Sequence, residues 1–160
     1  MSLSNGGFHA CFVDNISLFL ASLALADEPT SVSYYCAAEF AGGLRFDEAA
    51  KRWGSTEFVP RDKFLLKVTD RSAVQADGHK LISVSVTPSG SSNGAPCVQD
   101  GNYEMQLWPR GMIRCNSMLT DYVFNVKDNR FLAAYSFGFV DGEDAGGNTP
   151  SMTGGYCTKI

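Results

Sequence analysis

The chain has 160 residues, of which 44% are hydrophobic and 19% are charged. This length suits one domain with a single core and is too short for two. The formal net charge is −4 and the charges form no long block of one sign, which argues against a nucleic-acid-binding protein.

The first segment has the pattern of a secretory leader. Residues 16–26 form an apolar run that ends in an A-x-A cleavage pattern at 24–26 and is followed by polar residues. The run is shorter than the about 20 residues that span a bilayer, so we expect no stable membrane anchor. The residues before it include no lysine or arginine, which is atypical of a leader, and a buried first helix or strand is the alternative. We therefore expect a signal peptide at 1–26 and a periplasmic or secreted domain at 27–160.

The expected mature chain contains four cysteines, Cys36, Cys97, Cys115 and Cys157. Zinc ligands usually come in close couples, and these cysteines are too widely spaced for that arrangement. An even number in an exported chain favours two disulfides, with buried free thiols as the alternative. Of the three possible pairings we predict Cys36 with Cys157, which ties the opening strand to the closing one. Cys97 then pairs with Cys115 and fastens a loop to the strand that follows it.

Alternating apolar and polar residues predict short strands at intervals of about 8 to 12 residues. The four residues 48–51 have helical propensity, but a single turn does not hold by itself, so we expect a loop there. Loops rich in Gly, Ser or acidic residues are expected at 88–96 and 141–149. The predicted strands are 31–40, 44–47, 52–59, 63–69, 80–87, 103–107, 112–116, 121–127, 131–139 and 153–160.

These strands predict an all-β fold. A long antiparallel sheet tends to close or to fold over itself, because free edges invite aggregation. We expect a single antiparallel up-and-down β-barrel of roughly 8 to 10 strands, and a two-sheet β-sandwich is the alternative. No internal repeat is visible in the sequence.

Aromatic residues are the first candidates for a binding site. A barrel of about eight strands has room for one small apolar ligand in its interior. Trp53, Tyr135 and Phe137 are candidate ligand contacts, together with Arg130, whose charge adjoins a strand of large apolar side chains. The alternative is that the rings simply fill the interior as core.

A second candidate site is the acidic loop near the C-terminus. Asp141, Glu143 and Asp144 could supply oxygen ligands to Ca²⁺, which accepts irregular loops of carboxylates. The loop does not match the EF-hand pattern. The alternative is a solvated acidic loop at the end of a sheet.

A hydrolase is a weaker possibility. Residues 90–94 match G-x-S-x-G, but that motif needs a strand before it and a helix after it, and here it lies within a loop. A catalytic triad would require Ser92 to meet His79, the one histidine of the expected mature chain. Paired carboxylates are also conceivable, although their spacing does not place any two in one cleft.

A set of cysteines, aromatic residues and glycines spread along the chain forms a further pattern. Its positions are Cys36, Gly43-Leu44, Phe46-Asp47, Trp53, Phe58, Lys63-Phe64, Cys97, Cys115, Phe124-Asn125, Asn129-Arg130-Phe131-Leu132, Tyr135, Gly138-Phe139, Thr149-Pro150 and Gly155-Tyr156-Cys157-Thr158-Lys159-Ile160. Together they resemble a family of small exported bacterial β proteins without an established activity. The resemblance covers most of the expected mature chain. It implies export and a disulfide-stabilised β domain, and it offers no catalytic residues to carry over.

The sequence therefore favours a binding or interaction module, such as an inhibitor-like domain that binds a protein. In that case the loops 88–96 or 141–149 would carry the activity on a solid barrel. A calycin-like carrier of a small apolar ligand is the first alternative and a hydrolase the second. The expected partner is an unknown protein or a small apolar molecule. No cofactor and no nucleic acid are expected.

Overall fold

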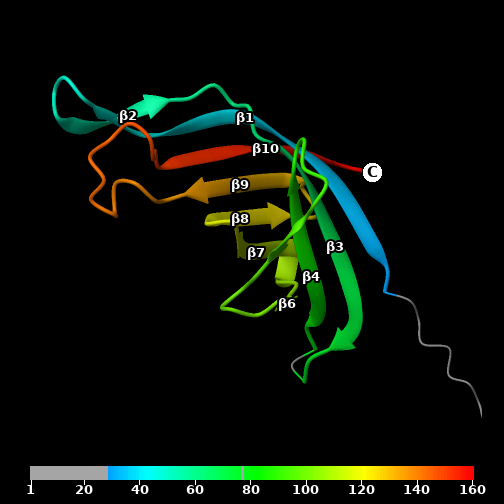
Figure 1. Ribbon diagram of the computed structural model, residues 1–160. Coiled ribbons are helices and arrows are strands. Elements are labelled where there is room, and N and C mark those ends of the chain that lie inside the picture. The colour runs from blue at the N-terminus through cyan, green and yellow to red at the C-terminus, as the bar shows by residue number, and fades with distance from the viewer. Residues whose placement is uncertain (1–28, 77) are drawn as a thin grey trace, which may run out of the picture.

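The computed structural model describes residues 29–76 and 78–160, and the protein is nearly all β in this part. The expected signal peptide lies outside the described residues. Within them, no helix is long and apolar enough to cross a bilayer. The strands are β1 (Ser31–Asp47), β2 (Arg52–Glu57), β3 (Lys63–Val74), β4 (Lys80–Pro88), β5 (Ala95–Cys97), β6 (Glu104–Gln106), β7 (Met112–Ser117), β8 (Thr120–Asn125), β9 (Arg130–Tyr135) and β10 (Ser151–Lys159) (Figure 1).

Eight of these strands form one antiparallel sheet that is nearly closed into a barrel. Their order is β5-β4-β3-β1-β10-β9-β8-β7, with β2 added to β1 and β6 added to β4. Apart from β2 and β6, strands that follow one another in the chain lie side by side, and the last strand pairs with the first. This up-and-down order confirms the predicted barrel.

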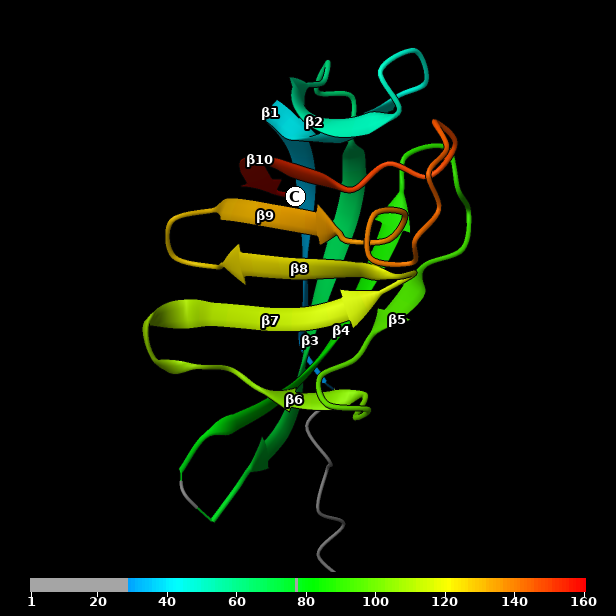
Figure 2. The ribbon, with the colours of Figure 1, turned by 90° about the vertical axis from the view of Figure 1, so that its left-hand side faces the viewer.

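Two short strands share one edge of β4. β5 pairs with Val84, Ser85 and Val86, and β6 pairs with the three residues before them. The chain leaves this edge between the two strands, at residues 98–103. This excursion brings the chain to β7, the strand at the other edge of the sheet (Figure 2).

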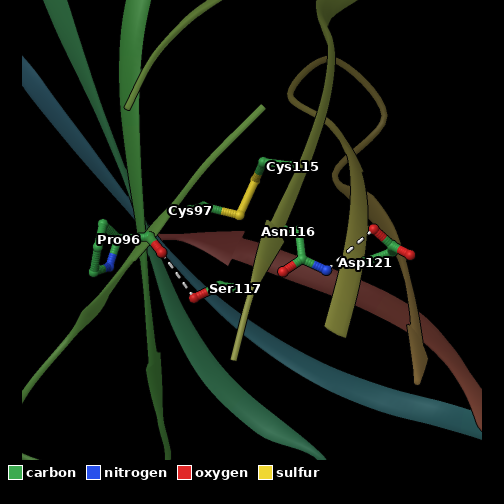
Figure 3. The surroundings of a disulfide bond; sticks show 6 residues. All are labelled: Pro96, Cys97, Cys115, Asn116, Ser117 and Asp121. Atoms are coloured by element: carbon green, nitrogen blue, oxygen red, sulfur yellow. Dashed lines mark hydrogen bonds between the residues drawn. A yellow bond between two sulfur atoms is a disulfide. The ribbon is translucent and has the colours of Figure 1, made fainter. Parts of the chain in front are cut away.

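The gap between β5 and β7 is closed at one point, which we call the seam. Val98 and Asn116 form an isolated antiparallel bridge, with N–H to O distances of 2.8 and 2.7 Å. The predicted disulfide between Cys97 and Cys115 lies beside it. Figure 3 shows this disulfide with two nearby hydrogen bonds. Ser117 Oγ donates across the gap to the Pro96 carbonyl oxygen at 3.0 Å, and Asn116 Nδ2 donates to Asp121 Oδ1 on β8 at 3.3 Å.

The second predicted disulfide, between Cys36 and Cys157, is also present. The two cysteines are directly opposite each other in the β1–β10 ladder, and both are buried. Both predicted pairings are thus confirmed. Two disulfides are consistent with an extracellular or other oxidising compartment.

Aromatic rings fill the interior of the barrel. Tyr34 on β1 contacts Phe124 on β8 with ring centroids 4.9 Å apart, and Phe64 on β3 contacts Phe131 on β9 at the same distance. In each case two other strands lie between the partners, so the contact crosses the interior. Burial raises the pKa of Tyr34 and that of Tyr122, whose ring packs on Phe64.

Several strand boundaries differ from the prediction. β5 was not among the predicted strands, and β3 continues past residue 69 to Val74. The sequence suggested a break at 41–43, whereas β1 runs through Gly42 and Gly43 without interruption. A Cβ at Gly43 would lie 2.1 Å from the carbonyl oxygen of Pro150, so the glycine allows close approach of the next segment and does not mark a turn. β9 ends at Tyr135, because the chain bends at Gly138, where φ is +103°.

Candidate functional site

Trp53, a predicted ligand contact, fastens the loop between β9 and β10 (residues 136–150) to β2. Its indole Nε1 donates a hydrogen bond to Asp144 Oδ1 at 2.8 Å. The ring also meets Phe139 edge-on, with the centroids 5.7 Å apart, and packs on Phe46 at 5.6 Å. Trp53 therefore holds a loop against the β1–β2 hairpin and does not line the barrel interior.

Tyr135 and Phe137 hold the other limb of the same loop. The hydroxyl of Tyr135 donates to Asn148 Oδ1 at 2.5 Å, and the two rings are 5.6 Å apart. Three of the four predicted ligand contacts thus lie at the barrel end where β9 finishes. Arg130 begins β9 and lies at the opposite end.

The three carboxylates of the acidic loop have three different partners. Asp141 Oδ2 accepts a hydrogen bond from the backbone N–H of Gly138 at 3.0 Å, and Asp144 accepts the hydrogen bond from the Trp53 indole. Glu143 Oε2 accepts Asn148 Nδ2 at 3.4 Å. The described residues contain no group of three or more His, Cys, Asp or Glu placed to hold a metal ion. These contacts give the loop a structural role and lend no support to a calcium site.

Ser92 and His79 belong to connections at opposite ends of β4. That strand has nine residues, which corresponds to a length of about 30 Å. Ser92 is exposed in the β4–β5 connection, and His79 directly precedes β4. This separation weighs against a triad built on the two side chains.

The exposed apolar side chains indicate a different candidate site, on the outer surface of the sheet. Six large apolar residues on neighbouring strands β3, β1, β10 and β9 face outward there. Phe40 is 57% exposed, Met152 52% and Tyr156 48%. Soluble monomers rarely expose large contiguous apolar areas without a role in recognition. We call these six residues the outer patch: Tyr35, Phe40, Leu65, Leu132, Met152 and Tyr156.

A β-bulge and a glycine bring the centre of the outer patch together. Regular alternation from Tyr34 would turn Phe40 inward, but the register shifts between Ala38 and Phe40 and turns its ring outward. Phe40 then pairs with Gly154, which pairs with Leu132 on its other side. A Cβ at Gly154 would lie 2.3 Å from the Phe40 ring and 2.8 Å from Leu132 Cδ2. The absent side chain allows these two to converge.

A shallow groove of about 350 Å³ adjoins this centre on the outer surface. Most of its exposed lining is apolar, and Arg130 borders it. The guanidinium lies 5.5 Å from the ring centroid of Tyr156, close enough for a cation–π contact. Of the four predicted ligand contacts, Arg130 lies here. The lining residues are Phe40, Met112, Val123, Asn125, Arg130, Phe131, Leu132, Gly155 and Tyr156.

Comparisons of the chain with protein-family models, curated proteins and solved structures found no match. Among the residues that the structure describes, the groove has apolar walls and one cation, and its lining includes no carboxylate, cysteine or histidine. This arrangement suits the binding of an apolar group beside a negative charge.

Sequence reasoning missed Phe40, Leu132 and Tyr156 as candidate site residues. All three lie on strands with the sequence pattern of a half-buried strand. The register of strand pairing determines which face of such a strand points outward. The signal that could have found them is the pair Gly154-Gly155 within a strand, since a glycine inside a strand often marks a bulge or a close approach.

Proposed function

We propose that the protein is a binding module of the periplasm or the extracellular space that recognises a partner protein through the outer patch. The observation that carries the proposal is the outer patch itself, with its exposed Phe40, Met152 and Tyr156. Aromatic residues and Met are enriched in protein interfaces, and a buried aromatic anchor often supplies much of the binding energy. Membership of the family of small exported bacterial β proteins is part of the same proposal.

The two alternatives have less support. A carrier needs an empty apolar interior, whereas rings from separate walls meet at 4.9 Å across this one. A hydrolase needs converging catalytic groups, and Ser92 and His79 lie at opposite ends of β4. An exposed apolar surface over a packed interior fits a protein-binding role better than either.

The proposal is tested by affinity capture with the oxidised protein and two variants. The first variant, Leu132→Ser with Tyr156→Ser, removes two anchors of the outer patch. The control, Val140→Ser, changes a residue that is 70% exposed but lies in the β9–β10 loop, away from the patch. All three are immobilised and exposed to the exported proteins of the source organism. Far-ultraviolet circular dichroism first establishes that they are equally folded.

We expect one protein to be retained by the wild type and by the control but lost by the double variant. Equal retention by all three would contradict the proposal. A small apolar molecule found bound one-to-one in native mass spectra would favour the carrier instead.

A further inference from the structure

The charge around the outer patch is opposite to the charge of the whole chain. The full sequence has 17 acidic and 13 basic residues. The strand segments that form and flank the patch (35–42, 63–67, 112–116, 121–125, 130–134 and 152–158) instead carry four cations against two carboxylates. The four cations are all exposed: Lys63, Lys67, Arg114 and Arg130.

The cross-strand register places these cations on both sides of the apolar centre. Lys63 pairs with Ala37, which pairs with Tyr156, which pairs with Arg130, so two cations lie on one row of the sheet's outer face, with Tyr156 between them. Arg114 extends the neighbouring row, which contains Leu132. The two carboxylates are Glu39, at the bulge, and Asp121, which accepts a hydrogen bond from Asn116.

Arg130 has no carboxylate partner in the described part of the chain. Asp128 is near in sequence, but its Oδ2 accepts Asn125 Nδ2 at 2.8 Å. The ion pairs among the described residues join other side chains. Stacking on Tyr156 orients the guanidinium beside the groove, so that little further ordering is needed when a carboxylate binds.

The groove beside Arg130 has the size of a pocket for one large side chain. Its volume of about 350 Å³ lies near the lower end of the range for small-ligand pockets. Phe40, Val123 and Leu132 give it apolar walls. If an apolar side chain of a partner occupied the groove, the residues next to it in the partner's chain would lie within reach of Arg130.

We infer that the partner presents an acidic peptide segment, with one large apolar side chain in the groove and an adjacent Asp or Glu paired with Arg130. This inference rests on the proposed function and adds the chemistry of the partner. A second copy of the chain is a poorer occupant, because a two-fold interface through this face would bring its four cations together.

The test uses three synthetic heptapeptides that carry a fluorescent label. Each has a central tryptophan, flanked on both sides by two glutamates, two glutamines or two lysines. Their affinities for the full chain are measured by fluorescence anisotropy at low salt, and amide chemical shifts locate the bound peptide. Two variants are compared with the wild type: Arg130→Gln, and the control Arg61→Gln, an exposed arginine of the β2–β3 connection.

We expect the glutamate peptide to bind about tenfold more tightly than the glutamine peptide, since a charge-assisted pair contributes about that factor. The lysine peptide should bind more weakly than both. Arg130→Gln should abolish the preference for glutamate and leave the glutamine peptide unaffected, while Arg61→Gln should change neither. Shifted amides should cluster in β8, β9, β10 and the second half of β1.

Other outcomes overturn the inference, and they separate it from the proposed function. If the three peptides bind the outer patch equally well, the patch still binds peptides but the acidic partner is wrong. If no peptide shifts an amide of the outer patch, the inference is wrong, and the capture experiment decides the proposed function independently. If vesicles of anionic phosphatidylglycerol bind the patch and the peptides do not, the occupant is a lipid surface and the inference is wrong.

Discussion

The two disulfides provide the sharpest test of how the barrel is held together. We compare two double variants, Cys36→Ala with Cys157→Ala and Cys97→Ala with Cys115→Ala. All four cysteines are at least 95% buried, so the packing loss is similar in both variants and largely cancels from their difference. What remains is the effect of each cross-link on the entropy of the unfolded chain.

The chain-entropy model gives different magnitudes for the two cross-links. Cys36 and Cys157 are 121 residues apart, which corresponds to about 4.9 kcal/mol of stabilisation at 25 °C. Cys97 and Cys115 are 18 residues apart, which corresponds to about 3.2 kcal/mol. In urea unfolding at neutral pH we therefore expect the first variant to lose more free energy of unfolding, by about 1.7 kcal/mol.

Local stability should follow the opposite order. The Cys36–Cys157 bond lies within a ladder of nine paired positions, whereas the Cys97–Cys115 bond supports the isolated Val98–Asn116 bridge at the seam. Hydrogen exchange of the Val98 and Asn116 amides should accelerate in the seam variant and stay slow in the other, relative to global unfolding. Equal losses of stability in urea, or a seam that stays protected without its disulfide, would refute this reasoning.

Three further predictions concern a buried hydroxyl, a turn and a buried phenol. Thr153 Oγ1 is buried and has no hydrogen-bond partner among the described residues, so Thr153→Val should raise the free energy of unfolding by about 1 kcal/mol in urea; a loss of stability would contradict this. Met118 and Leu119 form the β7–β8 turn with φ of 49° and 63°, and replacing them with Asn-Gly should stabilise by about 1 to 2 kcal/mol, measured as a higher thermal midpoint. The pKa of Tyr122 is raised above its ordinary value of 10.0 by burial, so its contribution to stability is complete below pH 10 and is lost as the pH rises toward the folded-state value. Unfolding curves between pH 8 and 11 should show a smaller alkaline loss for Tyr122→Phe, and an unchanged loss would count against a buried phenol.

The strand pattern was predictable where alternation is regular. In β3 and β4 the inward residues Phe64, Leu66, Val84 and Val86 are all buried, as a half-buried strand requires. The disulfide pairing was also predictable, because the first and last strands of an up-and-down barrel become neighbours when the ring closes. These features depend on local periodicity and on chain order, both of which the sequence records directly.

The outer patch depends on properties that the sequence does not record directly. The bulge before Phe40 reverses the face of every later residue in β1, and its one sequence signal lies on the partner strand, at Gly154-Gly155. Trp53, Tyr135 and Phe137 were expected to point into the barrel, but the chain bends after β9 and these rings hold a loop at one end. Aromatic content alone does not distinguish a ring in the core from one that holds a loop.

The pairing of β1 with β10 also has a consequence for the time course of folding. During synthesis β1 emerges early, yet one of its edges must wait for a strand that emerges more than a hundred residues later. Until then, that edge and the growing sheet are open to pairing with other chains. We expect refolding to be slow and sensitive to protein concentration, and the oxidation of Cys36 with Cys157 to mark the moment at which this risk ends.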